Sequence, residues 1–237
     1  IDLATGVSFS VNESALSTTL TTILGDVGGE NFNIVASGAD AAIDMRFIST
    51  VTNLEAINVT DGAGNNTITT SPWDAVRSIT HVSLGTGSDI VVLGNQGIAT
   101  GAASATITGF LAGNVGAYDQ ISSQWGGGAI SDGVFFERTS GIGTVQLADS
   151  SVLAANTSWF TAVNLTNAAN VLATITGNGV TGDANAAATL VVYDGLGHAG
   201  IYQLLETTGA AGSAFDECEL VGVVTTASNS LTAVNFT

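Results

Sequence analysis

Short apolar segments separated by Gly, Asn and Asp dominate the pattern of hydrophobic and polar positions along this chain of 237 residues. Segments of this length, rich in β-branched residues and bounded by turn formers, are typical of β-strands. We therefore predict strands over 32–36, 43–48, 54–59, around 68, and over 79–84, 90–93, 189–193, 201–205 and 220–224.

Two segments have a helical pattern instead. Between 12 and 24 the apolar residues Leu16, Leu20, Ile23 and Leu24 share one face, and Gly25 ends the run. A second apolar stripe lies within 157–173, in sequence rich in Asn and Thr. We predict one or two short helices that pack against the strands.

An internal repeat indicates how the strands are arranged. The segment Val59–Ile68 matches Val82–Val91 after a shift of 23 residues, with glycines in equivalent places. A repeat of this length suits a coil that buries its apolar face only by stacking on the next coil. The predicted fold is mainly β, either a β-solenoid (β-roll or β-helix-like) or an elongated β-sandwich.

Charge narrows the function classes. The chain has 20 acidic residues, three arginines (Arg46, Arg77 and Arg138), no lysine and a net charge of −17. Phosphate binding requires basic side chains, so nucleic acid is not an expected partner. No apolar run reaches 18 residues, so no transmembrane span is expected. Cys218 is the only cysteine, which leaves packing, bound ions or assembly to stabilise a secreted protein.

A glycine-rich motif carries the candidate chemistry. Leu84–Val92 follows the nonapeptide G-G-x-G-x-D-x-U-x except at its first glycine, and Asp61–Thr69 follows it with Asp for that glycine and Asn for the Asp. Glycines allow a tight turn, and a carboxylate supplies a hard oxygen ligand of the kind that Ca²⁺ prefers. The alternative is a Gly-rich hairpin in which the Asp satisfies the backbone of its own turn.

These motifs resemble the calcium-binding repeats of repeats-in-toxin (RTX) proteins. The segment 105–122 is similar to the sequence that follows such repeats, and 190–237 is similar to the C-terminal ends of large surface proteins exported by type I secretion. The two copies are not in tandem, so S-layer and adhesin-like proteins with scattered calcium sites are the better match. The resemblance implies a secreted calcium-binding protein, with candidate metal-site residues Asp61, Gly62, Gly64, Asn66, Gly85, Gly87, Asp89 and Asp119.

Signatures of catalysis are weak. The stretch 177–182 matches G-x-G-x-x-G and follows a strand-like segment at 173–176, but no helix long enough for a dinucleotide-binding unit is expected after it. His81 and His198 are not in zinc-ligand spacing, and no G-x-S-x-G elbow occurs. We therefore expect no enzymatic activity.

We predict a domain boundary near residue 150, between a repeat region (1–150) and a C-terminal module (151–237). Two hypotheses for function follow. The first is a structural subunit of an extracellular surface layer, filament or adhesin that folds and self-associates with Ca²⁺. Further acidic clusters at Asp40/Asp44, Asp183/Asp194 and Asp216/Glu217/Glu219 would add to this dependence on cations. The second is a secreted module that binds or acts on carbohydrate, such as a cell-surface glycan, through an exposed row of Trp73, Trp125 and Trp159.

Overall fold

Strands are the main regular element of the described chain, which has a single α-helix, and this confirms the prediction of a mainly β protein. The structure is a computed structural model. It describes residues 1–16, 22–26, 28–36, 38–46, 48, 50–70, 79–93, 105–113, 116–123, 135–138, 145–148, 151–155, 160, 164–227 and 230–237.

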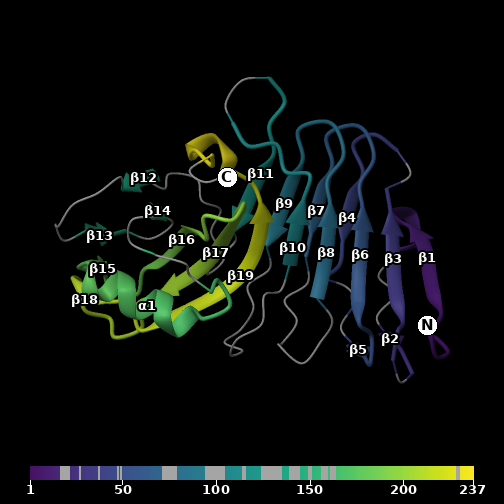
Figure 1. Cartoon of the computed structure of the whole chain (residues 1–237), viewed down its shortest axis with the longest axis horizontal. Coiled ribbons are helices and arrows are strands. Elements are labelled where there is room, and N and C mark those ends of the chain that lie inside the picture. The colour runs from purple at the N-terminus through teal and green to yellow at the C-terminus, as the bar shows by residue number, and fades with distance from the viewer. Residues whose placement is uncertain are drawn as a thin grey trace.

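The largest sheet among the described residues has ten strands and runs the length of the molecule (Figure 1). Its order in space is β1 (Ser8–Asn12), β3 (Asn31–Val35), β6 (Ala56–Thr60), β8 (Ile79–Ser83), β10 (Ala105–Thr108), β19 (Glu217–Thr225), β17 (His198–Leu205), β16 (Ala187–Tyr193), β14 (Val152–Ala155) and β12 (Phe135–Arg138). Its first five strands pair in parallel, and the central pairs β16–β17 and β17–β19 are antiparallel.

A second, four-stranded parallel sheet accompanies the first half of the large one. Its order is β4 (Ala42–Asp44), β7 (Thr67–Thr69), β9 (Ile90–Leu93) and β11 (Gln120–Ser123). The chain alternates between the two sheets: β3 is followed by β4, β6 by β7, β8 by β9 and β10 by β11. A third parallel pair joins β2 (Thr22–Leu24) to β5 (Thr50–Thr52). We call residues 1–123 the stacked region.

The remainder of the chain, residues 135–237, is the mixed region. It contributes β12, β14, β16, β17 and β19 to the large sheet, and a small sheet of β13 (Val145–Leu147), β15 (Val180–Gly182) and β18 (Ser213–Ala214). The helix α1 (Ala168–Gly177) buries Val171 and Ile175 and contacts β19. The short 3-10 turns are η1 (Glu13–Ala15) in the stacked region and η2 (Ala233–Asn235) near the C-terminus.

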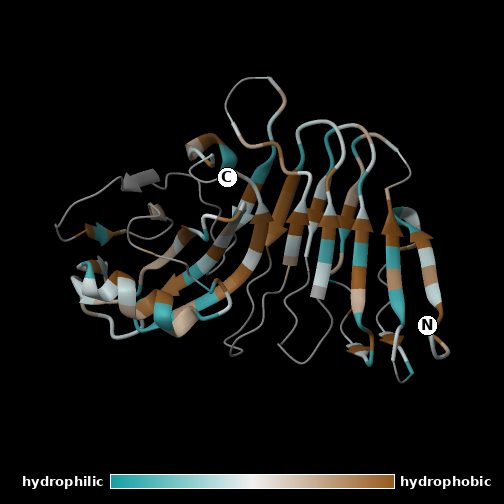
Figure 2. Cartoon of the chain, viewed as in Figure 1, coloured by the Kyte–Doolittle hydropathy of each residue, from teal (hydrophilic) through white to brown (hydrophobic). Residues whose placement is uncertain are grey.

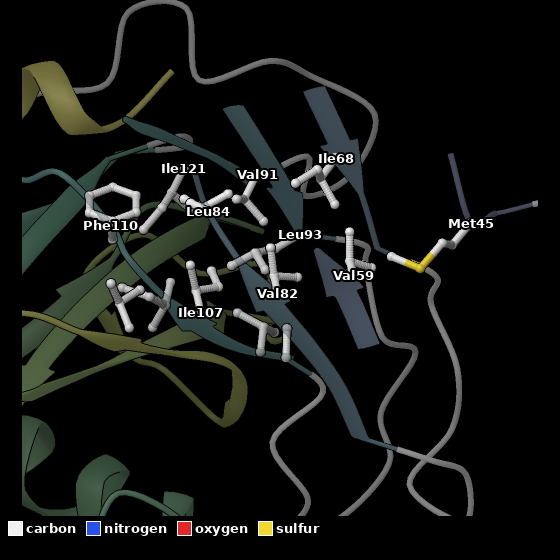
Figure 3. Close-up of a cluster of buried hydrophobic side chains, with 14 of the residues drawn as sticks. Met45, Val59, Ile68, Val82, Leu84, Val91, Leu93, Ile107, Phe110 and Ile121 are labelled. Carbon is white, nitrogen blue, oxygen red and sulfur yellow. The ribbon is translucent and has the colours of Figure 1, made fainter. Parts of the chain in front are cut away.

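Apolar side chains lie between the sheets in rows that follow the strand register. Val59, Val82 and Ile107 occupy equivalent positions on β6, β8 and β10, and Ile68 and Val91 do so on β7 and β9 (Figure 3). The hydropathy colouring shows brown segments alternating with polar ones along these strands (Figure 2). Burial of this core is the main favourable contribution to folding, and it continues into the mixed region through residues such as Val191 and Ile201.

A second core lies around α1. It joins apolar residues of the helix to one face of the large sheet, including Leu190, Tyr202 and Leu220. The boundary expected near residue 150 falls between β13 and β14, whereas β12 pairs with β14 and β13 with β15. The pairing of β10 with β19 connects the stacked and mixed regions within one sheet. The division at 150 stays a prediction.

The predicted strands are confirmed in both regions, except that the strand expected over 43–48 ends at Asp44. The predicted first helix is wrong in its described part. Residues 22–24 form β2, which pairs in parallel with β5, and only Glu13–Ala15 make a single 3-10 turn. Ile23 is buried in the core as part of a strand. A local pattern could not predict this, because the partner strand lies 28 residues later in the chain. Leu20 lies outside the described residues.

The second helix exists but begins and ends later than expected. Asn167 caps α1 by accepting a hydrogen bond from the amide of Asn170, and the helix continues to Gly177. Phe160 lies outside the helix, and 157–159 and 161–163 are outside the described residues. The G-x-G-x-x-G stretch therefore follows a helix, not the strand expected over 173–176, and ends in β15. This order is the reverse of the strand-to-helix turn of a dinucleotide site.

Candidate functional site

The glycine-rich motifs lie in the turns that lead from the large sheet to the four-stranded sheet. The turn at 61–66 follows β6, and the turn at 84–89 follows β8. Ala63 and Thr86 form a parallel bridge between the two turns, and the amide of Gly64 donates to the carbonyl of Thr86 at 2.8 Å. The repeat found in the sequence therefore stacks on itself directly.

Glycine is required in the second copy because the turns approach each other so closely. A Cβ on Gly85 would lie 1.7 Å from the carbonyl oxygen of Gly62, and one on Gly87 would lie 2.0 Å from that of Gly64. Gly64 and Gly87 also have φ values of 112° and 147°, which L side chains rarely adopt. By contrast, the nearest atom to a Cβ on Gly62 would be 3.8 Å away. Gly64, Gly85 and Gly87 thus have a packing role that does not depend on a metal, whereas Gly62 does not.

An inner ladder of side chains links four successive turns. Asn66 Oδ1 accepts from the amide of Ala41, Asp89 Oδ1 from the amide of Asn66 at 2.8 Å, and Asp119 Oδ1 from the amide of Asp89 at 2.9 Å. Asp119 Oδ2 also accepts from the amide of Leu111 at 2.7 Å. Each of the three ladder side chains is buried. The predicted residues Asn66, Asp89 and Asp119 are therefore brought together, and each one satisfies the backbone of a preceding coil.

An outer ladder runs beside it in the opposite sense. Asp40 Oδ1 accepts from the amide of Asn65, Asn65 Oδ1 from the amide of Ser88, and Ser88 Oγ from the amide of Tyr118. Here the earlier coil supplies the acceptor and the later coil the amide. This ladder was not among the sequence predictions, although Asn65 and Ser88 occupy equivalent places in the repeat.

Asp61 places a third carboxylate near those of Asp89 and Asp119 in the inner ladder. Asp61 is buried, and its oxygens accept from the amides of Gly62 at 2.8 Å and Gly85 at 3.4 Å. Burial, together with the carboxyls of Asp61 and Asp119, raises the pKa of Asp89 to about 6, against the lowering effect of the Asn66 amide. Burial also raises the pKa of Asp119, with a smaller contribution from Asp61.

One oxygen of this group has no hydrogen-bond donor. Asp89 Oδ2 is buried and accepts no hydrogen bond from a described residue, and a hydrogen bond with the Asp61 carboxyl, which requires a proton between them, contributes to the raised pKa of Asp89. A buried carboxylate oxygen in this state is costly unless a proton or a cation satisfies it. The described residues contain no group of three or more His, Cys, Asp and Glu side chains that could hold a metal ion. A cation here would therefore need amide or backbone carbonyl oxygens besides Asp61 and Asp89, which is within the ligand chemistry of Ca²⁺.

Most carboxylates of the other predicted acidic clusters have hydrogen-bond partners instead, although Glu217 Oε2 is buried without one among the described residues. Asp44 pairs with Arg46, and this hydrogen bond lowers the pKa of the Asp44 carboxyl. Asp183 accepts from Gln146, Asp194 from the amides of Leu196 and His198, and Asp216 from Thr207. These carboxylates organise turns in the structure.

The remaining candidate residues, a cysteine, two histidines and three tryptophans, add no further functional site among the described residues. Burial raises the pKa of the Cys218 thiol to about 12, with a further contribution from Glu219, so the thiol is poorly suited to reaction. The side chain of His81 is exposed on β8, and His198 bonds Asp194 at 2.7 Å. Trp73, Trp125 and Trp159, on which the carbohydrate hypothesis depends, lie outside the described residues.

The described part of the chain has no helix with the length and hydropathy needed to cross a bilayer. Comparisons with known proteins found no matching family model, no similar curated protein and no similar solved structure.

Proposed function

We propose that this protein is a structural subunit of an extracellular assembly, a surface layer, filament or adhesin, whose folding and self-association depend on Ca²⁺. The observation that carries the proposal is the buried Asp61–Asp89–Asp119 group, in which Asp89 Oδ2 accepts no hydrogen bond from a described residue. We propose no catalytic activity for the chain.

The stacked region is proposed to be a β-solenoid. Three features support this: the alternation of strands between two parallel sheets, the in-register pairing of each strand with one about a coil later, and the direct stacking of equivalent turns. A stack of this kind presents long rows of identical backbone geometry. A regular stack of this kind suits a rigid scaffold protein. The arrangement is also consistent with the resemblance to S-layer and RTX-type proteins.

Calcium would be held by Asp61 and Asp89, with Asp119 as a neighbouring negative charge. When bound, the ion supplies positive charge at a place where buried carboxylates repel one another. Asp89 would then be ionised in the folded state, although burial raises its pKa. Because the carboxylates come from successive coils, binding would couple directly to the stacking of those coils.

Self-association is supported by charge and by one free edge. The net charge of −17 makes contact between copies unfavourable until cations are bound. Within the described residues β1 pairs only with β3, so one side of β1 has an unpaired edge in the large sheet, and Phe9 on this strand is 40% exposed. Unprotected edge strands pair readily with other chains.

The proposal is tested by measuring particle size and thermal unfolding in excess calcium, in excess magnesium and in chelator. We expect larger particles and a higher melting temperature in calcium, since a ligand at 100 times its Kd stabilises a fold by about 2.7 kcal/mol. Asp89→Asn should lose most of the calcium-dependent change in melting temperature. A monomer with the same melting temperature in all three conditions would contradict the proposal.

A further inference from the structure

Two further carboxylates, those of Asp26 and Glu30, bond neighbouring residues of one turn at the N-terminal end of the stack, away from the glycine-rich turns. Asp26 and Glu30 both contact the turn at residues 4–7, which is closed by a hydrogen bond from the amide of Val7 to the carbonyl of Ala4 at 3.1 Å. Neither residue belongs to a motif in the sequence.

Glu30 gives the stronger evidence for a bound ion. It is 0% exposed at the start of β3, and its Oε1 accepts from the amide of Gly6 at 2.7 Å. Its other oxygen, Oε2, is buried and has no hydrogen-bond partner among the described residues. This repeats the situation of Asp89, where one oxygen accepts from the preceding coil and the other is unsatisfied.

Asp26 brings a second carboxylate to the same turn. Its Oδ2 accepts from the hydroxyl of Thr5 at 2.8 Å, and Thr5 directly precedes the Gly6 that donates to Glu30. Asp26 is exposed, so this carboxylate faces solvent, from which an ion would enter. The two carboxylates thus bond adjacent residues of the chain, and one has a buried oxygen without a partner while the other is exposed to solvent.

No positive side chain neutralises the pair in the described part of the chain. Arg46 is the only Lys or Arg whose side chain is described, and it is paired with Asp44. The amino group of Ile1 donates to the carbonyl of Thr22 at 2.9 Å. A buried carboxylate with neither a cation nor a full set of donors is disfavoured.

We propose that Asp26 and Glu30 form a second divalent-cation site, selective for a hard ion such as Ca²⁺, that fastens the first turn of the chain onto the stack. Carboxylate oxygens, backbone carbonyls and water are the ligands such an ion takes. The site is separate from the Asp61–Asp89 group, so this proposal can be tested independently of the function proposed above.

Native mass spectrometry of the full chain, titrated with calcium alone, counts the ions bound at each site. The variants are Glu30→Gln and Asp26→Asn at the new site, Asp89→Asn at the first site, and Asp40→Asn as a control. Asn at position 40 keeps the acceptor for the Asn65 amide, tolerates the left-handed φ of 59°, and removes one exposed charge of the same region. Melting temperatures with and without calcium are measured on the same samples.

We expect Glu30→Gln and Asp26→Asn each to bind one ion fewer than the wild type, and Asp40→Asn to bind as many. Glu30→Gln with Asp89→Asn should bind two fewer. If Glu30→Gln does not fold, Asp26→Asn decides the matter, because its side chain is exposed and its loss does not open the core.

Equal ion counts in the wild type and in Asp26→Asn and Glu30→Gln would overturn this site, and a loss in Asp89→Asn alone would leave the function proposed above intact. The reverse pattern, with ions lost only in Asp26→Asn and Glu30→Gln, supports the new site and contradicts the first. A wild type that binds no calcium would overturn both.

Discussion

Glu206 of the mixed region and Asp89 of the stacked region are both buried carboxylates, but their surroundings are opposite. In the mixed region Glu206 is buried, yet it accepts from the amides of Asn185, Thr208 and Gly209, and hydrogen bonding to Thr208 lowers its pKa. In the stacked region Asp89 faces two other carboxyls and its pKa is raised to about 6. Both are acidic side chains in turns next to strands, but only the first has enough donors.

The difference teaches how local contacts decide the role of an acidic residue. In the mixed region, backbone amides nearby in the chain or on an adjacent strand donate to Glu206, Asp194 and Asp216. Each of these carboxylates is therefore stabilised by hydrogen bonds from its own surroundings. In the stack, the acceptors of one coil serve the amides of another, and the side chains form a row of like charges. Such a row is stable only if protons or cations compensate it.

The largest effect should come from the glycine that separates two stacked turns. Gly85→Ala places a Cβ 1.7 Å from the Gly62 carbonyl oxygen, so the turns must move apart. We expect the free energy of unfolding to fall by about 3 kcal/mol or more, at the upper end of overpacking effects. Denaturant unfolding measures it.

Gly62→Ala is the matched control at the equivalent place in the other copy of the motif. Its Cβ would meet only the carbonyl oxygen of Ala36, at 3.8 Å. We expect a change below about 1 kcal/mol. Equal losses for Gly62→Ala and Gly85→Ala would show that the close stacking of these turns is not what limits stability.

A second pair of variants tests the contrast between the carboxylates directly. In chelator, Asp89→Asn should raise the free energy of unfolding by about 1–3 kcal/mol, because it removes an uncompensated buried charge and keeps the acceptor for the Asn66 amide. Glu206→Gln should lower it, because it exchanges a well-bonded carboxylate for a weaker acceptor. Both are measured by thermal and denaturant unfolding, and destabilisation by both variants would remove the distinction between the two regions.

The pH dependence should differ in sign between Asp89 and the well-bonded carboxylates of the mixed region. The pKa of Asp89 rises from 3.8 in the unfolded chain to about 6, so the folded state holds a proton that the unfolded state has lost between these values. Without cations, its contribution to stability therefore falls as pH rises from about 4 to 6. The pKa values of Asp194, Glu206 and Asp216 are lowered, so their stabilising contribution is lost as pH falls through the acid range.

The difference in unfolding free energy between wild type and Asp89→Asn, measured in chelator from pH 4 to 7, isolates the first contribution. It should shift in favour of the variant as pH rises and level off above about pH 6. A constant difference over this range would mean that Asp89 titrates alike in the folded and unfolded chains.

The smallest effect is expected at the surface of the stacked region. Arg46→Gln removes the ion pair with Asp44, whose two side chains are 55% and 27% exposed. Exposed pairs contribute about 0–1 kcal/mol, and salt screens them. A loss well above this, measured by denaturant unfolding at 0.1 M salt or more, would show that surface charge contributes as much as the interior carboxylates.

The strands of the stacked region could be predicted because their signal is local. Segments such as 32–36 and 56–60 carry apolar residues at alternate positions, and the repeat at 59–68 and 82–91 fixes their spacing. The local pattern over 12–24 gave a wrong prediction of a helix, because β2 forms by pairing with β5, whose residues lie far along the chain.

The candidate site could be predicted in composition but not in its bonding. The motif singled out Asn66, Asp89 and their glycines, and Asp119 came from a resemblance. Their partners lie 23 to 30 residues away, so no local pattern shows that the carboxylates bond to backbone amides of other coils. Glu30 carries no motif signal, because its distinction is an unsatisfied oxygen in the interior.

The most direct test of the account is amide hydrogen exchange in excess calcium and in chelator, resolved along the chain by mass spectrometry. The account predicts that calcium slows exchange in the turns at 61–66 and 84–89, where the amides of Asn66 and Asp89 donate to the inner ladder, and changes little in β16, β17 and β19. Exchange in the two turns that is the same with and without calcium would contradict it.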